Sequence, residues 1–165
     1  MYHHLEHPRV IGDLLLYRIN RLLSAGGAPI IRLCEGRFGI TRREWRVLAA
    51  LAQYKNLLSS ELADCAQLDR SRTSKAITTL VQKKLLQRKI LSSDRRKAQL
   101  ALTESGYALY DGMFPQVLKI HAELIGGLTA AEVMQLDMLL EKLQEQAEIM
   151  QLAHDWPKAN RGRHA

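Results

Sequence analysis

The sequence has few aromatic residues, two cysteines and no long apolar run, and each shortage excludes a class of protein. No apolar stretch approaches the roughly 18 residues that a membrane-spanning helix needs. Aromatic residues make up only 5% of the chain, which disfavours a groove that stacks the bases of a single strand. The N-terminal residues MYHHLEHPRV are polar and unlike a secretory signal, so we expect a cytoplasmic protein.

Residues that carry catalysis or bind metals are also scarce. Cys34 and Cys65 fit a reduced compartment better than a disulfide framework. Neither they nor the six histidines have the spacing of a metal site. Paired acids, a nucleophile with a base and a phosphate-binding glycine loop are missing as well. We therefore expect a protein that is not an enzyme and that needs no metal or cofactor.

Positive charge is concentrated in one short part of the chain. Residues 68–97 contain ten basic and two acidic residues, a net charge of +8, whereas the other 135 residues contain 14 basic and 15 acidic residues. Each lysine or arginine that neutralises a phosphate releases counterions, so such a segment is typical of a protein that binds a polyanion. Charge alone leaves open a solvated basic face without a partner.

The first 40 residues contain one long helical pattern. Apolar residues recur at helical spacing between residues 9 and 35, which predicts a helix over that range. Gly26, Gly27 and Pro29 lie inside it. We expect them to kink or split the helix, because proline lacks a backbone donor and glycine weakens a helix.

A capping-box pattern predicts where the next helix begins. Thr41 and Glu44 have the required spacing, so we expect a helix over about residues 42–54. Its predicted buried face consists of Trp45, Val47, Leu48 and Leu51.

Two further helices complete a predicted helix-turn-helix. Ser59 or Ser60 can cap a short helix that ends near residue 65 or 66. Asp69 or Ser71 can cap the following helix, which runs to about residue 84. The predicted core face of that helix is Ala76, Ile77, Leu80 and Val81.

The opposite face of this fourth helix is polar, short-chained and basic. It carries Arg70, Ser71, Arg72, Ser74, Lys75, Thr78 and Gln82. Serine and threonine can bond to bases or phosphates, and arginine or lysine can bind guanine in the major groove. We therefore predict that this helix lies in the major groove of DNA.

After the fourth helix the apolar pattern changes to the period of a strand. Leu86, Arg88 and Ile90 alternate, and Leu100 and Leu102 alternate again, which predicts a two-stranded hairpin. A helix-turn-helix followed by such a hairpin is a winged helix-turn-helix.

The tip of the predicted hairpin is basic, with one acid. Arg95 and Arg96 suit the minor groove, where negative potential is concentrated. Asp94 can hold Arg96 by a charge-assisted hydrogen bond, and a simple Asx turn at Asp94 is compatible with that role.

The C-terminal third predicts two long helices. Thr103 caps the first, which Pro115 should bend or break near Phe114, and Thr129 with Glu132 forms a capping box for the second. Each helix has an apolar stripe that a single small domain cannot cover. We therefore expect a homodimer in which these helices and the first helix pack against the partner.

The predicted fold class is mainly α, with about six helices and a two-stranded β wing. We expect residues 1–165 to form one chain of this type, with a DNA-binding lobe at 41–103. Residues 9–36 together with 104–152 form the dimerisation helices, and residues 153–165 form a flexible tail.

The residues at the wing also carry a resemblance to a known family. The run Asp94-Arg95-Arg96, followed by Leu-Ala-Leu-Thr-Glu-Ser-Gly at residues 100–106, resembles the wing signature of the MarR family, D-x-R and then L-x-L-T-x-x-G. The resemblance covers about residues 9–150. Similar residues in the helix-turn-helix are Leu62, Ala63, Leu68, Ser71, Thr73, Leu80, Leu85 and Leu86.

The resemblance implies a dimer that binds an inverted repeat, with the fourth helix in the major groove and the wing arginine in the minor groove. It implies that Asp94 orients Arg96. One departure is Leu86, where the family often has glycine before the strand, and this alters the expected turn. Because such regulators usually respond to a small molecule, the resemblance also implies an effector between the dimerisation helices and the DNA-binding lobe.

The expected effector is an aromatic acid, a phenol or a related thioester. The candidate lining residues are Tyr17, Arg18, Trp45, Arg46, Tyr110, Phe114 and His121. Arg18 and Arg46 could each pair with a carboxylate, or could simply extend to solvent or pair with an acid of the partner. The aromatic residues and His121 could equally belong to the core or the dimer interface.

Two other functions remain open at this point. Some family members sense peroxide through a cysteine near the first helix, and Cys34 or Cys65 could act in that way, although a buried cysteine is usually inert. A non-specific architectural DNA-binding protein would need only the basic segment.

Overall fold

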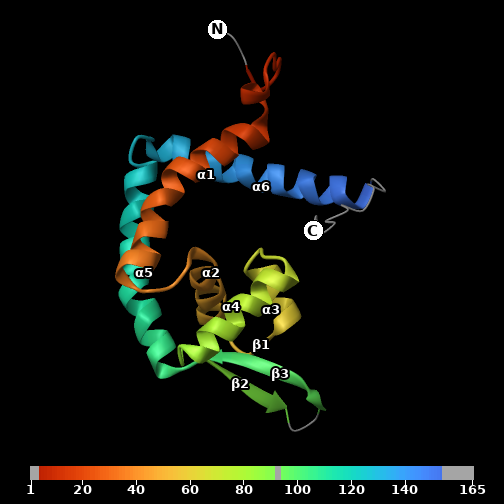
Figure 1. Cartoon of the computed structure of the whole chain (residues 1–165). Coiled ribbons are helices and arrows are strands. Elements are labelled where there is room, and N and C mark those ends of the chain that lie inside the picture. The colour runs from red at the N-terminus through yellow and green to blue at the C-terminus, as the bar shows by residue number, and fades with distance from the viewer. Residues whose placement is uncertain (1–3, 92–93, 154–165) are drawn as a thin grey trace, which may run out of the picture. The chain divides into compact units, whose positions relative to one another are not determined.

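The computed structural model describes residues 4–91 and 94–153, and the side chains of residues 89–98 lie outside that description. The chain divides into two compact units, residues 1–122 and residues 123–165, and each is described by itself. The elements run in the order η1 (Ile11–Asp13), α1 (Leu15–Arg32), η2 (Leu33–Arg37), α2 (Arg42–Gln53), β1 (Leu57–Leu58), α3 (Ser59–Cys65), α4 (Arg70–Gln82), β2 (Leu86–Leu91), β3 (Asp94–Leu102), α5 (Glu104–Ile125) and α6 (Ala130–Ala153). Figure 1 follows this order by colour.

The mainly helical fold with a β wing is confirmed, and the sheet has one strand more than expected. β2 and β3 form the predicted antiparallel hairpin, with Leu86 opposite Leu102 and Arg88 opposite Leu100. The two-residue strand β1 pairs with the other edge of β3, so the sheet has the order β1-β3-β2. A strand of two residues has too little periodic pattern to be recognised in the sequence.

The first helix begins later than predicted. Residues 9–14 do not continue α1, because the carboxylate of Asp13 accepts hydrogen bonds from the backbone N–H groups of Arg9 and Val10. His4 Nδ1 lies 2.8 Å from the same carboxylate, which closes a separate N-terminal turn. These hydrogen bonds lower the pKa of Asp13, and the bond from the N–H of Arg9 has the largest effect.

The prolines do not break the helices. α1 continues through Pro29, and α5 continues through Pro115. Of the expected kink or split near residues 26–29, the split does not occur, and of the expected bend or break near Phe114, the break does not occur. α1 passes into the π-helix η2, and Gly39 then adopts a left-handed conformation with φ of 61°. Each proline removes one backbone donor, and the remaining backbone hydrogen bonds of the helix keep it continuous on both sides of the proline.

Most helix starts follow the predicted caps. Thr41 accepts from the N–H of Glu44, whose carboxylate accepts from the N–H of Thr41 in return. The same reciprocal pair forms between Thr129 and Glu132 at the start of α6, and it lowers the pKa of Glu132. The predicted short third helix and its end near residue 65 are confirmed, but its predicted serine cap is wrong. α3 begins at Ser59, and the N–H of Leu58 before it donates to the carboxylate of Glu61.

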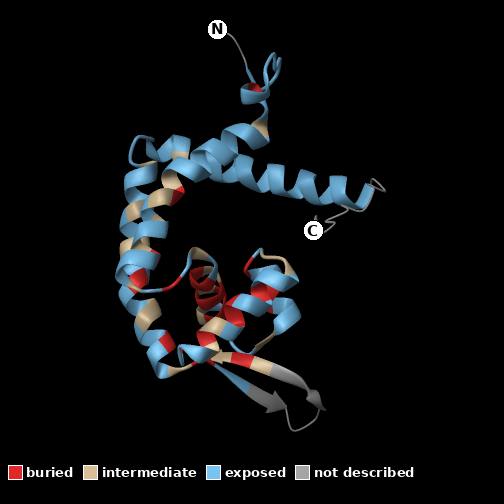
Figure 2. Cartoon of the chain, in the orientation of Figure 1, coloured by how far each residue is buried: buried red, intermediate tan, exposed pale blue. Residues whose placement is uncertain are grey.

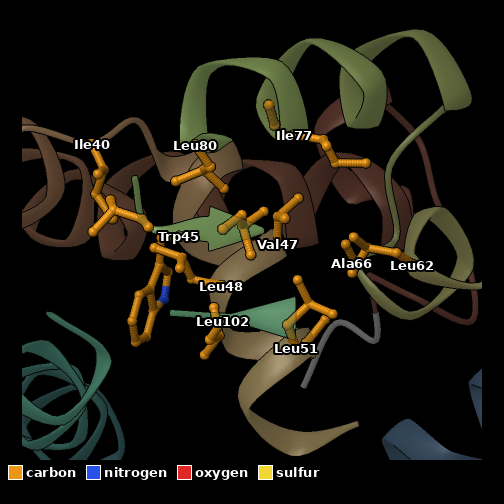
Figure 3. Packing of buried hydrophobic residues seen from close by; sticks show 14 of the residues in the cluster. Ile40, Trp45, Val47, Leu48, Leu51, Leu62, Ala66, Ile77, Leu80 and Leu102 are labelled. Atoms are coloured by element: carbon orange, nitrogen blue, oxygen red, sulfur yellow. The ribbon is translucent and has the colours of Figure 1, made fainter. Parts of the chain in front are cut away.

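One hydrophobic core lies between α2, α3, α4 and the sheet, as the buried residues in Figure 2 and the packing in Figure 3 show. The predicted face of α2 is confirmed, since Trp45, Val47, Leu48 and Leu51 are all buried. Of the predicted face of α4, Ala76, Ile77 and Leu80 are buried, and Val81 is partly buried. Cys34 and Met113 extend the core to η2 and α5.

The long helices leave apolar residues uncovered. α6 buries none of its 24 residues in this single chain, although it carries a series of leucines and methionines. Leu16 and Met134 are 75% and 63% exposed. Among the described helices, none combines the length and the apolar character that crossing a membrane would require.

Candidate nucleic-acid interface

α4 is anchored to the core by one face, which directs the other face to solvent. Thr73 is buried on the anchored side, and its hydroxyl donates to the backbone carbonyl of Asp69 at 2.9 Å. The Asp69 carboxylate caps the helix by accepting from the N–H of Arg72 at 2.8 Å. Of the two predicted caps, Asp69 and Ser71, the structure has Asp69.

The exposed face of α4 is the polar, basic face that the sequence predicted. All seven of its residues are exposed, namely Arg70, Ser71, Arg72, Ser74, Lys75, Thr78 and Gln82. The Thr78 hydroxyl donates to the carbonyl of Ser74 at 3.0 Å, so toward solvent it presents an acceptor and a methyl group. Arg72 is 58% exposed and holds an ion pair of 3.1 Å with Asp69. This face can offer donors and cations to a ligand outside the protein.

The turn between α3 and α4 is supported from α2. Gln67 adopts a left-handed conformation with φ of 51°, and the N–H of Leu68 donates to the carbonyl of Ala63. Arg46 Nη2 donates to the carbonyl of Gln67 at 2.8 Å. The sequence suggested Arg46 as an effector contact, and the structure gives it this further contact, which holds the start of α4.

The wing tip can be described only for its backbone. β3 begins at Asp94, which pairs with Leu91, and the register shifts between Ile90 and Leu91. The side chains of Asp94, Arg95 and Arg96, to which the sequence assigned the minor-groove contact, lie outside the described residues.

The second half of the wing signature has a structural explanation. Thr103 caps α5 by accepting from the N–H of Gly106, and its hydroxyl donates to the carbonyl of Lys84 at 2.7 Å. A Cβ on Gly106 would collide with the carbonyl oxygen of Leu85. The L-x-L-T-x-x-G run therefore packs the base of the wing against the turn after α4. In that turn the left-handed residue is Lys84, with φ of 58°, while Leu86 is buried.

Three of the suggested effector residues stack together. The ring of Trp45 lies 5.6 Å from that of Tyr110, which lies 5.2 Å from that of Phe114, and both pairs are nearly parallel. Trp45 is 7% exposed, so this stack joins α2 to α5 at the edge of the core.

The other suggested effector residues do not take part in that stack. Tyr17 and His121 are exposed on α1 and α5, and Arg18 lines a shallow cleft with Leu15 and Leu22. Arg46 lines a different cavity, which also contains Arg42, Arg43 and Arg72. Arg42 and Arg43 were not among the residues suggested by the sequence. The spacing of four between Arg42 and Arg46 does place Arg42 and Arg46 on one face of a helix.

The two cysteines have opposite environments. Cys34 is fully buried, and burial, followed by the negative charge of Glu35, raises the pKa of its thiol to about 11. Cys65 is exposed at the end of α3. Among the described residues, no group of three or more histidines, cysteines, aspartates or glutamates could hold a metal ion.

Comparisons with known proteins match this architecture. The model of the MarR family matches residues 38–97, which contain the helix-turn-helix and most of the wing. The HTH-type transcriptional repressor MdtR of Bacillus subtilis (strain 168) is 30% identical over 110 residues, which cover 67% of this chain and 71% of that protein. This chain belongs to the MarR family.

Other MarR-like proteins extend the comparison. The homoprotocatechuate degradative operon repressor of Escherichia coli is 28% identical over 114 residues, 69% of this chain and 74% of that protein. A solved structure concerns the regulation of DNA binding of Bordetella bronchiseptica BpsR by 6-hydroxynicotinic acid. It is 25% identical, has a TM-score of 0.75, and the similarity covers 84% of this chain and 98% of that one. As a MarR-family member, this chain is a DNA-binding transcription regulator, and its exposed α4 face is the candidate DNA contact.

Proposed function

We propose that this protein is a homodimeric repressor that binds an inverted repeat in double-stranded DNA and is released by a small aromatic acid, phenol or related thioester. The main observation that supports the DNA contact is the exposed basic face of α4, whose opposite face is buried in the core. Arg70, Arg72 and Lys75 supply cations there, while Ser71, Ser74 and Thr78 supply short polar groups that fit a groove. We place this activity in the cytoplasm, where the DNA of a bacterial operator would lie.

The proposed lobe for DNA, residues 41–103, uses two contacts. α4 enters the major groove, and the wing places Arg95 and Arg96 at the minor groove, with Asp94 orienting Arg96. The β2–β3 backbone supports a projecting hairpin, because its paired strands run to Leu91 and Asp94.

The proposed dimer is formed by residues 9–36 together with 104–152. Exposed apolar side chains on these helices support it, since a monomer would leave them in water. They include Leu16, Ile19, Leu22, Leu23, Leu118, Leu124, Leu136, Leu140 and Leu143. A stable homodimer buries at least about 1,200 Å² in total, and helices of 18, 22 and 24 residues are long enough to supply such an area. A second copy of this chain is therefore the proposed occupant of these faces.

The proposed effector binds near Tyr17, Arg18, Trp45, Arg46, Tyr110, Phe114 or His121. The named ligand of BpsR, 6-hydroxynicotinic acid, is a small aromatic acid and supports this class of effector. Such a ligand can release DNA only if it binds one form of the dimer more tightly than the DNA-binding form. In the form that it favours, the spacing of the two recognition helices does not match the operator.

The test is selection of DNA by the full-length protein from a pool of random duplexes, followed by footprinting. We expect a protected palindrome whose half-sites lie about one helical turn apart. Equal affinity for every duplex would instead support an architectural DNA-binding protein. Sedimentation of the same sample should give the mass of two chains.

The redox alternative is tested separately. Cys34 is a poor peroxide sensor, because burial and the raised pKa of its thiol keep it protonated. Cys65 is exposed and is the cysteine that remains to be tested. If peroxide releases DNA from the wild type and not from a variant with both cysteines replaced by serine, the protein is a thiol sensor.

A further inference from the structure

A cavity of about 430 Å³ lies within residues 23–72, between α1, the start of α2 and the start of α4. Its volume is within the range of roughly 300–1,000 Å³ that is usual for small-molecule sites. Its lining combines positive charge with an apolar wall. Arg42, Arg43 and Arg46 come from α2, and Arg72 comes from α4.

The positive charge in this cavity is only partly balanced. Glu35 is the one acid in the lining, against four arginines. Arg72 is paired with Asp69 beside the cavity at 3.1 Å, whereas Arg46 binds the neutral carbonyl of Gln67. Burial lowers the pKa of Arg46, and the neighbouring positive charge of Arg42 lowers it further. Two like charges held together in this way favour an anion between them.

Packing holds Arg42 in place. A Cβ built on Gly27 of α1 would lie 3.2 Å from Nη1 of Arg42, so the guanidinium rests against the backbone of α1. A side chain positioned before the ligand arrives loses less conformational freedom on binding. The planar guanidinium donates in pairs to carboxylate or phosphate oxygens.

Apart from the arginines, Glu35 and Thr41, the lining is apolar. Leu23 and Ile31 of α1 and Leu68 before α4 also line the cavity. A ligand that satisfies both parts carries an apolar body and a group with more than one negative charge. A single carboxylate supplies one charge, whereas a phosphate monoester near pH 8 supplies almost two.

We propose that this cavity binds a phosphate-bearing organic anion, and that such an anion, including a thioester whose carrier bears phosphate, is the effector of the regulator proposed above. The inference rests on that proposed function for its regulatory meaning. Arg72 belongs both to this cavity and to the face of α4 proposed to contact DNA. A bound phosphate therefore competes with the DNA backbone for Arg72 and holds the start of α4 against α1 and α2.

The first experiment measures binding to the full-length protein without DNA. Phenyl phosphate and benzoate serve as probes by isothermal titration calorimetry at pH 8 and constant ionic strength. We expect phenyl phosphate to bind about tenfold tighter than benzoate, because its second charge reaches a further arginine. Equal affinities for the two probes would overturn the proposal.

Three variants localise the binding. Arg43→Gln and Arg46→Gln should each weaken phenyl phosphate binding about tenfold, and Glu35→Gln should strengthen it. The matched control is Arg32→Gln, which removes the same charge from an exposed residue of α1 outside the cavity lining. If Arg43→Gln and Arg32→Gln have the same small effect, the ligand does not bind in this cavity. Arg43 is exposed, so its variant should fold normally, which circular dichroism checks.

The second experiment separates this inference from the proposed function. Fluorescence anisotropy measures the affinity of wild type and Arg43→Gln for the selected duplex, with and without phenyl phosphate. We expect phenyl phosphate to weaken DNA binding of the wild type and to affect Arg43→Gln less. Phenyl phosphate binding in a protein that binds no duplex would support the cavity and refute the regulator. If Arg43→Gln weakens DNA binding and leaves phenyl phosphate binding unchanged, the cavity holds a DNA phosphate and the proposal is wrong.

Discussion

The ammonium group of Lys83, just beyond α4, lies 2.9 Å from Oε2 of Glu44 in the first turn of α2. The same ammonium donates to the carbonyl of Gly39 at 2.8 Å, and Glu44 is only 4% exposed. Glu44 also accepts from the N–H of Thr41 as part of the cap of α2. One carboxylate therefore caps α2 and attaches the end of the proposed recognition helix to it.

Removing Lys83 should destabilise this connection. Lys83→Met leaves a nearly buried carboxylate without its cation, so we expect the free energy of unfolding to fall by about 1–2 kcal/mol. Urea denaturation measures it. Lys55→Met is the control, since Lys55 is exposed in the loop after α2, and its effect should stay below about 0.5 kcal/mol. Equal effects of the two variants would show that the contact with Glu44 contributes nothing.

Gly106 should not tolerate a side chain. Gly106→Ala directs its Cβ into the carbonyl of Leu85, so the wing base or α5 must shift, and we expect a loss of about 1–3 kcal/mol. Thermal denaturation measures the loss. Gly127→Ala is the matched control, because a Cβ there meets no atom within 4 Å. A melting temperature for Gly106→Ala that equals that of Gly127→Ala would contradict this packing.

Alkylation should distinguish the cysteines. At pH 8 a thiol with a pKa of about 11 is ionised in roughly one molecule per thousand, so Cys34 should resist iodoacetamide. Its reactivity should rise only as the pH approaches 11. Cys65 is exposed and should react in the native protein. Mass spectrometry of the labelled peptides gives both rates, with urea-unfolded protein as the control in which both cysteines react. Rapid native labelling of Cys34 would refute its burial.

Substitutions in the wing should separate its proposed roles. Arg96→Ala should lower affinity for the selected duplex and weaken the preference for a narrow minor groove. Asp94→Ala should have part of the same effect even though it removes a negative charge. Competition with duplexes of different minor-groove width measures both. Tighter binding by Asp94→Ala would mean that Asp94 does not orient Arg96.

Lys75→Ala, on α4, should weaken the major-groove contact and leave the sedimentation coefficient unchanged.

The apolar stripe of α6 offers a test of the dimer. Leu140→Glu places a charge on a helix that buries none of its residues in a single chain, so folding of residues 1–122 should be unaffected. In a dimer the same charge is buried without a partner, and association should weaken by about 2 kcal/mol or more. Sedimentation equilibrium of Leu140→Glu and of the control Gln135→Glu, at an exposed residue on another side of α6, measures the difference. Unchanged association for Leu140→Glu would exclude this face of α6 from the interface.

Features that depend on residues close together in the chain could be predicted from the sequence. The caps at Thr41, Asp69 and Thr129 lie where their spacing predicted, because a cap joins a side chain to a backbone N–H only two or three residues away. The alternation of Leu100 with Leu102 likewise predicted the hairpin, since strand side chains alternate between two faces.

Contacts between distant residues were decided only by the tertiary structure. β1 exists because Leu57 meets Leu100, 43 positions later in the chain. The arginines of α2 share a cavity with Arg72 because the core sets how α2, α4 and α1 pack, and the bond from Arg46 to Gln67 depends on the same packing. No local sequence pattern encodes such contacts, because they arise from the burial of apolar faces over the whole domain.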